Sequence, residues 1–344
     1  MTDFYLFRHG ETDMNAQTRW QGRGIDSELN ANGENQARAL AENLKGAGLE
    51  IIYASPLKRA LKTAQIVGES LNVHVVEEKG FMEASLGDAE GLKRAEIKEK
   101  FPKEFAEWHN LDDAFMDARF PNGQSKREIQ KSMVEALIRT AENCPSRKIG
   151  IASHSAVLRY FMLYLGLRMP AIEHGTPIVV HYENGVFSYD ENNPLYVREI
   201  EAFELNAALS LVRDVFMRFE APTYSARGVR TFLDFIAPQN LTNPQNDIAL
   251  YGCFRGAELI GVAGTRGENH LCLLFVKENR QGKGAGKMLL RAAAYRAKNW
   301  LGKDCLTVNS AESAVLFYEK RGFKATGGVC ERDGIRFVPM RLDL

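Results

Sequence analysis

The sequence predicts an α/β protein of two domains: a three-layer αβα sheet domain over residues 1–195 and a smaller α+β domain over residues 196–344. Two observations lead to this prediction. In the first half, short apolar segments alternate with helical patterns, which is the signature of βαβ units. From residue 248 onward, apolar segments follow one another through short turns, the pattern of an antiparallel sheet. A chain of 344 residues is long enough for two domains of ordinary size.

Three predicted strands of the first half run directly into polar residues. The first ends at Arg8-His9-Gly10, the second (49–54) runs into Ser55-Pro56-Leu57-Lys58-Arg59, and the third (148–153) ends at His154. Ligands of open α/β sheets bind at the carboxyl ends of the strands, so we expect these two histidines and two arginines to meet in one crevice. Such a group describes a phosphate site with its own nucleophile.

Helices are predicted over 32–45 and 57–71, and a charged, helix-rich insertion over 93–142 is the natural place for a substrate lid. A hairpin follows near 178–189, with its turn at Asn184-Gly185. The polar segment 190–194 is the predicted boundary between the domains.

Composition excludes several classes of protein. Lys plus Arg and Asp plus Glu balance at 44 each, so no bulk positive charge indicates a nucleic-acid partner. No apolar run reaches the length of a membrane span, and the N-terminus lacks the basic start of a signal peptide. Five irregularly spaced cysteines fit reduced thiols, which predicts a cytoplasmic protein, and no Cys/His cluster suggests a metal site.

Separated motifs occur in order along the first half: Arg8-His9-Gly10-Glu11-Thr12, Asn15, Gln21-Gly22, Ser55 to Ala60, Thr63-Ala64, Glu83 and Ser153-His154-Ser155. Together they resemble the histidine phosphatase superfamily (phosphoglycerate-mutase-like). The resemblance implies that His9 is the nucleophile that becomes phosphohistidine and that Glu83 is the proton donor. It also implies a set of residues that bind the phosphoryl oxygens: Arg8, Arg59 and His154, assisted by Thr12, Asn15 and Gln21.

These residue types suit phosphoryl transfer. A neutral imidazole can attack phosphorus, guanidinium groups match phosphate oxygens bidentately, and a protonated carboxyl group can donate to the leaving oxygen. Side chains supply the cations, so no metal is required. The remaining histidines are expected to be structural or at the surface: His74, His109, His174, His181 and His270.

Two features bear on the substrate. Gly123-Gln124-Ser125 departs from the Gly-Glu-Ser that is common in the family, which weakens any analogy of substrate. The segments Arg19-Trp20-Gln21-Gly22 and Asp26-Ser27-Glu28-Leu29 resemble the phosphatase branch, and the domain is short for a cofactor-dependent mutase. The prediction is a phosphatase acting on a small phosphorylated metabolite, with a phosphoglycerate-type mutase as the alternative.

The second half carries an unrelated motif. Gln281-Gly282-Lys283-Gly284-Ala285-Gly286 follows an apolar strand that ends at Val276, and it opens a helix; Asn309, Phe317-Tyr318-Glu319-Lys320 and Gly322-Phe323 lie downstream. This pattern resembles the GNAT N-acetyltransferases. Glycines allow a pyrophosphate to approach closely, and the free amides at the helix start bind the anion.

The resemblance implies acetyl-CoA as cofactor, bound by the residues from Gln281 to Gly286 with Val276 and Asn309. It also implies that Tyr318 protonates the leaving thiolate, while Glu278 or a chain of waters would serve as base for an amine acceptor. The whole chain is therefore predicted to be bifunctional. The alternative is a phosphatase whose C-terminal domain only senses acyl-CoA.

Overall fold

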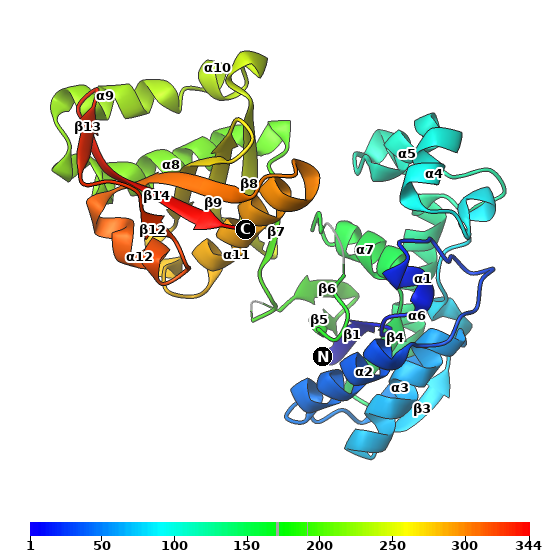
Figure 1. Cartoon of the computed structure of the whole chain (residues 1–344). Helices are drawn as coiled ribbons and strands as arrows, with labels where there is room; N and C mark the ends of the chain where they lie inside the picture. Colours follow the sequence, from blue (N-terminus) through cyan, green and yellow to red (C-terminus); the bar gives the residue numbers. More distant parts are fainter. Residues whose placement is uncertain (170–171, 191) are drawn as a thin grey trace. The chain divides into compact units, whose positions relative to one another are not determined.

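The computed structural model describes residues 1–169, 172–190 and 192–344. The chain folds as two compact units, Met1–Pro194 and Leu195–Leu344, and each is described by itself (Figure 1). Among the described residues, no helix is both long enough and apolar enough to span a membrane.

The first unit is built on a six-stranded sheet in the order β3-β2-β4-β1-β5-β6. Its strands are β1 (Thr2–Arg8), β2 (Ile51–Ala54), β3 (His74–Glu77), β4 (Lys148–Ser153), β5 (Ile178–Glu183) and β6 (Val186–Tyr189). Strands β1 to β4 are parallel, and the hairpin β5–β6 adds an antiparallel edge. Parallel neighbours align the carboxyl ends of β1, β2 and β4 at one edge of the sheet.

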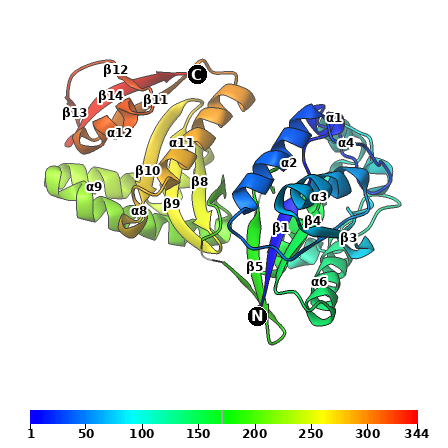
Figure 2. The ribbon, with the colours of Figure 1, turned by 90° about the horizontal axis from the view of Figure 1, so that it is seen from below.

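Helices cover both faces of this sheet (Figure 2). They are α1 (Asp13–Ala16), α2 (Ala31–Leu44), α3 (Lys58–Leu71), α4 (Arg94–Lys100), α5 (Pro102–His109), α6 (Lys126–Asn143) and α7 (Ser155–Tyr164). On one face, Phe7 of β1 packs in a cluster with Leu40 of α2 and residues of α3. On the other, Phe4 contacts Phe187, which contacts Phe161 of α7. Side chains three apart on a strand point to opposite faces, so the unit has the predicted three layers.

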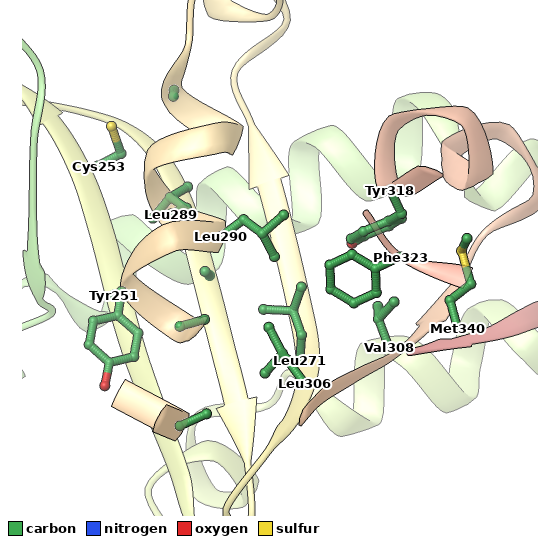
Figure 3. Close-up of a cluster of buried hydrophobic side chains, with 14 of the residues drawn as sticks. Tyr251, Cys253, Leu271, Leu289, Leu290, Leu306, Val308, Tyr318, Phe323 and Met340 are labelled. Atoms are coloured by element: carbon green, nitrogen blue, oxygen red, sulfur yellow. The ribbon is translucent and has the colours of Figure 1, made fainter. Parts of the chain in front are cut away.

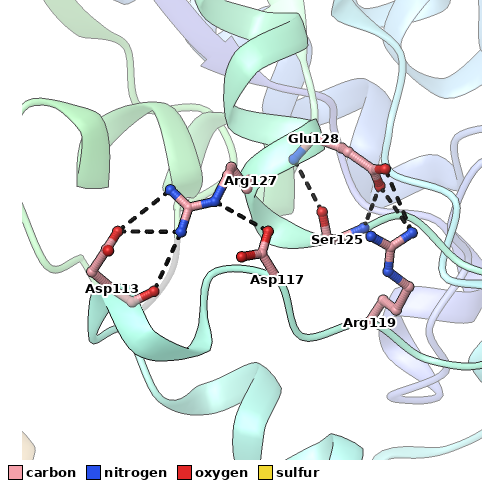
Figure 4. Close-up of polar contacts among 6 residues, drawn as sticks. All are labelled: Asp113, Asp117, Arg119, Ser125, Arg127 and Glu128. Atoms are coloured by element: carbon pink, nitrogen blue, oxygen red, sulfur yellow. Dashed lines mark hydrogen bonds and ion pairs between the residues drawn. The ribbon is translucent and has the colours of Figure 1, made fainter.

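The insertion between β3 and β4 is fastened at the start of α6 (Figure 4). Ser125 and Glu128 form a reciprocal capping box, an arrangement that contributes about 1 kcal/mol to a helix. Arg127 pairs with Asp117 at 3.1 Å and Asp113 at 3.4 Å, and Arg119 pairs with Glu128 at 3.4 Å. These contacts connect α6 to the turn Asp113–Phe115, which follows α5.

The second unit contains an eight-stranded sheet in which β12-β14-β11-β10-β9-β8-β7 lie in order and β13 pairs with β14. The strands are β7 (Tyr196–Glu199), β8 (Ile248–Arg255), β9 (Glu258–Arg266), β10 (His270–Val276), β11 (Cys305–Ser310), β12 (Lys324–Ala325), β13 (Cys330–Arg332) and β14 (Ile335–Asp343). Strands β10 and β11 are parallel and pair only where His270 and Leu271 face Thr307 and Val308. Beyond that point the two strands separate.

Helices flank this sheet as well. They are α8 (Leu205–Phe219), α9 (Ala226–Phe235), α10 (Pro238–Leu241), α11 (Ala285–Tyr295), the π-helix Arg296–Trp300 and α12 (Val315–Glu319). Leu289 and Leu290 of α11 pack with Leu271 and Leu306 of the sheet in a cluster that also contains Tyr318 (Figure 3). A second cluster joins α8 to β9 and β10.

Candidate active sites in the two units

His9 stands directly after β1, where its backbone N–H donates to Ser153 O at 3.1 Å and extends the pairing with β4. Gly10 follows because there is no room for a side chain: a Cβ there would lie 2.3 Å from Gly33 O. His9 Nδ1 lies 2.7 Å from Gly10 O, so we assign the ring proton to Nδ1. Nε2 is then left with a bare lone pair, as a nucleophile requires.

Two buried guanidinium groups accompany His9. Arg59 donates to Ile25 O at 2.9 Å and to Gly22 O at 2.8 Å, and Arg8 donates to Ile172 O at 3.1 Å. In the part of the chain that the structure describes, the Nε atoms of both arginines are buried and have no hydrogen-bond partner. Buried charged donors that protein atoms leave unmatched are suited to the oxygens of an anion.

Burial and nearby charges favour the neutral forms of His9 and His154. The rings of His9 and His154 lie 5.1 Å apart between centroids. Burial lowers the pKa of His9 well below its usual value, and the neighbouring His154, Arg8 and Arg59 lower it further. Burial, followed by Arg59 and Arg8, also lowers the pKa of His154. Its Nε2 lies 2.8 Å from Ser55 Oγ, while its buried Nδ1 has no partner among the described residues.

Glu83 is a buried carboxyl group, 8% exposed, that lines one cavity together with Arg8, His9 and Arg59. Burial raises its pKa, although the N–H of Ala84, which donates to Oε1 at 2.9 Å, acts in the opposite direction, as do Arg59 and Arg8. A raised pKa keeps a carboxyl group protonated at higher pH, as a general acid needs. Gln124 lies close by, because its Oε1 accepts from the N–H of Ser85 at 2.9 Å.

The three assisting residues form one hydrogen-bonded chain. Gln21 Nε2 donates to Thr12 Oγ1 at 2.7 Å, and Thr12 Oγ1 donates to Asn15 Oδ1 at 3.1 Å. Asn15 and Gln21 line the cavity, whereas Thr12 is fully buried and contributes from behind them.

The cavity measures about 250 Å³ and takes part of its lining from the insertion between β3 and β4. Its lining also includes Arg94, Trp108, His109 and Arg159, which sequence reasoning did not assign to the site. His109, expected to be structural or at the surface, thus faces the site. His174 supports the site in another way: its ring lies 5.7 Å from that of His9, and its Nδ1 donates to His9 O at 2.5 Å. No local pattern marks these residues, since their elements converge only in the folded unit.

In the second unit, residues 281–284 are exposed and lead into α11. Gly284 adopts a left-handed φ of 95°, and a Cβ on Gly282 or Gly284 would have open space around it. The turn therefore presents backbone amides to an unobstructed surface at a helix N-terminus, which suits a pyrophosphate. Gly286 differs, because a Cβ there would lie 3.3 Å from the ring of Phe317.

Asn309 and Tyr318, which lie downstream of this turn in the sequence, line a separate cavity of about 420 Å³. Tyr318 of α12 is 5% exposed, and burial, followed by the charge of Glu220, raises its pKa. Asn309 is exposed on β11, beyond the short stretch in which β10 and β11 pair. The chain enters α12 through a 3-10 turn, Glu312–Ala314. Glu278 does not line this cavity and forms an ion pair with Arg218 at 2.7 Å.

Two different protein families match the two halves of the chain. Residues 4–193 match the model of the histidine phosphatase superfamily (branch 1), and residues 220–344 match that of the acetyltransferase (GNAT) domain. The uncharacterized phosphatase PhoE of Bacillus subtilis is 37% identical over 158 residues, which are 46% of this chain and 74% of that protein. A probable phosphoglycerate mutase, GpmB of Serratia proteamaculans, is 37% identical over 137 residues, 40% of this chain and 62% of that protein.

Solved structures show the same fold. Bacillus stearothermophilus YhfR has a TM-score of 0.50 at 27% identity and covers 55% of this chain and 95% of its own. A mycobacterial glucosyl-3-phosphoglycerate phosphatase has a TM-score of 0.51 at 24% identity, covering 55% of this chain and 98% of its own, a likeness of fold alone. The family match spans more than half of the chain, so this protein belongs to the histidine phosphatase superfamily, and it carries a GNAT acetyltransferase domain after its phosphatase-type domain.

Proposed function

We propose that the first unit is a metal-independent phosphomonoesterase that acts through a phosphohistidine on a small phosphorylated metabolite, and that the second is an acetyl-CoA-dependent N-acetyltransferase. One observation supports the proposed phosphatase activity of the first unit most directly. The unprotonated nitrogen of His9 shares a buried cluster with two guanidinium groups whose Nε donors have no partner among the described residues.

The mechanism follows from these positions. His9 Nε2 attacks phosphorus while Arg8 and Arg59 hold the phosphoryl oxygens and stabilise the charge that develops on them. Glu83 gives its proton to the leaving oxygen, and the carboxylate that results takes a proton from the water that attacks the phosphohistidine. Phosphate leaves, and both His9 and Glu83 return to their starting states.

Arginine side chains at the cavity can stabilise the charge on a phosphoryl group, which supports a reaction without a metal ion. Among the described residues, no group of three or more His, Cys, Asp or Glu side chains is arranged to hold a metal. Arg94 and Arg159, on α4 and α7, add positive charge to the same cavity. This charge favours substrates with a second anionic group besides the phosphate.

For the second unit, the exposed turn Gln281–Gly286 and the separated strands β10 and β11 fit acetyl-CoA. Val276 and the backbone from Gln281 to Gly286 would hold its pyrophosphate, and Asn309 would lie on the strand that lines the extended cofactor. The bound cofactor supplies the acetyl group and the thiolate leaving group. Tyr318 would hold the proton that the thiolate needs, because its raised pKa keeps the hydroxyl protonated.

The test is hydrolysis of p-nitrophenyl phosphate by the full chain in EDTA, together with acetyl transfer from acetyl-CoA to a panel of amines. We expect phosphate release without any added acceptor. Activity that EDTA abolishes and a divalent ion restores would contradict the metal-free mechanism. Phosphate transfer that requires a phosphoester acceptor would instead support the mutase alternative, which the likeness to GpmB proteins keeps open. Acetyl-CoA binding without acetylation of any amine would favour the sensor alternative.

A further inference from the structure

The cavity of the second unit that Asn309 and Tyr318 line, about 420 Å³ in volume, has a group of aromatic rings among its lining residues. Its aromatic lining residues are Phe216, Tyr224, Phe232, Phe235, Phe275, Tyr318 and Phe337. The rings of Phe216 and Phe232 stack with centroids 3.9 Å apart, and Phe275 lies 5.7 Å from Phe232. A cavity of this size and lining suits a small ligand with an apolar, ring-shaped part.

Two carboxylates, Glu220 and Asp333, line the same cavity, and they differ in their partners. Asp333 is paired with Arg227 at 2.9 Å and lies 3.9 Å from Arg332. Glu220, half-buried at the end of α8, accepts a hydrogen bond from the hydroxyl of Tyr224 at 3.3 Å. No cation is paired with Glu220 in the described part of the chain, so it is the carboxylate free to bind a cationic ligand.

The charges that face Glu220 favour this role. Burial raises its pKa, and the hydrogen bond from Tyr224 lowers it in part. Glu220 in turn contributes to the raised pKa of Tyr318, which places the carboxylate near the hydroxyl of that tyrosine. The other titratable groups on the cavity are His270, whose pKa burial and Arg266 lower, Cys272, whose pKa burial raises, and the side chains of Arg266 and Arg332. A half-buried carboxylate in a cavity with aromatic faces provides two attractions for an ammonium group.

We propose that this cavity binds the acceptor as a primary amine with an apolar, ring-sized substituent, and that Glu220 pairs with its ammonium group and accepts one proton from it. This inference rests on the proposed N-acetyltransferase function and names its substrate class. It also assigns the role of base to Glu220, in place of the Glu278 or water chain expected from sequence.

The protons balance as follows. The ammonium group transfers one proton to the Glu220 carboxylate, which becomes a neutral carboxylic acid and later releases that proton to solvent. The amine nitrogen then has a lone pair for the new N–C bond, which forms as the C–S bond of the acetyl donor breaks. Tyr318 protonates the sulfur and regains a proton from the nitrogen, so that the amide is neutral.

The test measures binding of three probes to the full chain by calorimetry. The probes are 2-phenylethylamine, ethylamine, which lacks the ring, and 2-phenylethanol, which lacks the ammonium group. We expect 2-phenylethylamine to bind at least about tenfold more tightly than either of the others, a difference of about 1.4 kcal/mol or more, since each of the others lacks one of the two attractions. Equal or tighter binding of ethylamine would contradict the proposal that the acceptor carries an apolar, ring-sized substituent.

Variants test the carboxylate. Glu220→Gln should weaken binding of 2-phenylethylamine about tenfold or more and leave 2-phenylethanol unchanged, because only the amine loses a charged partner. Glu220→Asp should recover part of the affinity. Asp214→Asn, at an exposed site of the same helix, is the matched control. A Glu220→Gln protein that binds the amine normally, or a loss seen in Glu278→Gln instead, would overturn the assignment.

Acetyl-CoA binding, measured on the same proteins, separates this inference from the function on which it rests. If the wild-type protein binds acetyl-CoA and acetylates other amines but does not prefer 2-phenylethylamine, the inference about the cavity fails alone. If it binds no acetyl-CoA, the proposed acetyltransferase function fails. Normal acetyl-CoA binding by Glu220→Gln would also show that this variant is folded.

Discussion

The imidazole rings of His9 and His154 lie 5.1 Å apart, and burial together with Arg8 and Arg59 keeps both rings in their neutral form. The two histidines come from neighbouring parallel strands, β1 and β4, whose residues Arg8 and Ser153 are in register. A neutral His9 is the form that the proposed attack on phosphorus requires. The carboxyl ends of the two strands thus bring two imidazole rings together.

His9→Ala is expected to lower phosphatase turnover by on the order of 10³-fold or more, because the variant has no nucleophile to form the covalent intermediate. Acid-labile phosphate on His9 of the wild-type protein, detected by mass spectrometry after rapid quenching, would establish the intermediate. His74→Ala, at an exposed position of β3, serves as the control. Near-normal turnover in His9→Ala, or label on a serine, would remove His9 from this role.

The pH dependence of kcat/KM should be bell-shaped. On the acidic side activity falls as His9 gains a proton, and the lowered pKa of His9 moves this limb below pH 6.5, the usual histidine value. On the alkaline side activity falls as Glu83 loses its proton. The raised pKa of Glu83 moves this limb above pH 4.5, the usual glutamate value. An alkaline limb that persists unchanged in Glu83→Gln would assign it to another group.

Glu83→Gln should slow the hydrolysis of alkyl phosphates much more than that of p-nitrophenyl phosphate. An alkoxide leaving group needs the proton that Glu83 supplies, whereas nitrophenolate leaves without it. The ratio of kcat/KM for the two substrates measures this difference. Glu77→Gln, exposed at the end of β3, should leave the ratio at the wild-type value. Equal slowing of both substrates would mean that Glu83 acts in binding.

Gly284→Val should abolish acetyl-CoA binding, as measured by calorimetry, because a side chain would occupy the surface to which the turn presents its amides. Gly284 also has a positive φ, so Gly302→Val, at a φ of 63° with open space around it, controls for backbone strain. Gly286→Val is a poorer test, since its side chain would press on Phe317. Unchanged binding in Gly284→Val would place the pyrophosphate elsewhere.

Tyr318→Phe should spare acetyl-CoA binding and slow acetyl transfer, because it keeps the ring that packs on Phe323 and removes the proton donor. The control is Tyr251→Phe, since Tyr251 belongs to the same cluster and is equally buried at 5% exposure (Figure 3). Steady-state rates with a reactive amine provide the measurement. Equal slowing in both variants would indicate a packing effect and no proton transfer.

The sequence by itself determined the fold class and family of both halves, because the relevant signals are local. A strand that ends in Arg8-His9-Gly10 and a glycine-rich turn that opens a helix are contiguous segments with their own conformational requirements. The parallel order of the strands then implies that residues at their carboxyl ends meet. The bounds of several elements also followed from the sequence to within two residues, as for the helix predicted over 32–45 and found over Ala31–Leu44.

Only the tertiary structure decided which other residues face the two cavities. Arg94 and Arg159 reach the phosphatase cavity from helices that are separated by the long α6, and His174 supports His9 across 165 residues of sequence. The sequence alone does not show which of Glu220 and Glu278 would lie near the acceptor amine. In the structure, Glu220 is half-buried near Tyr318, whereas Glu278 forms an ion pair with Arg218 at the surface. Burial and charge depend on every neighbouring element, so these assignments required the folded chain.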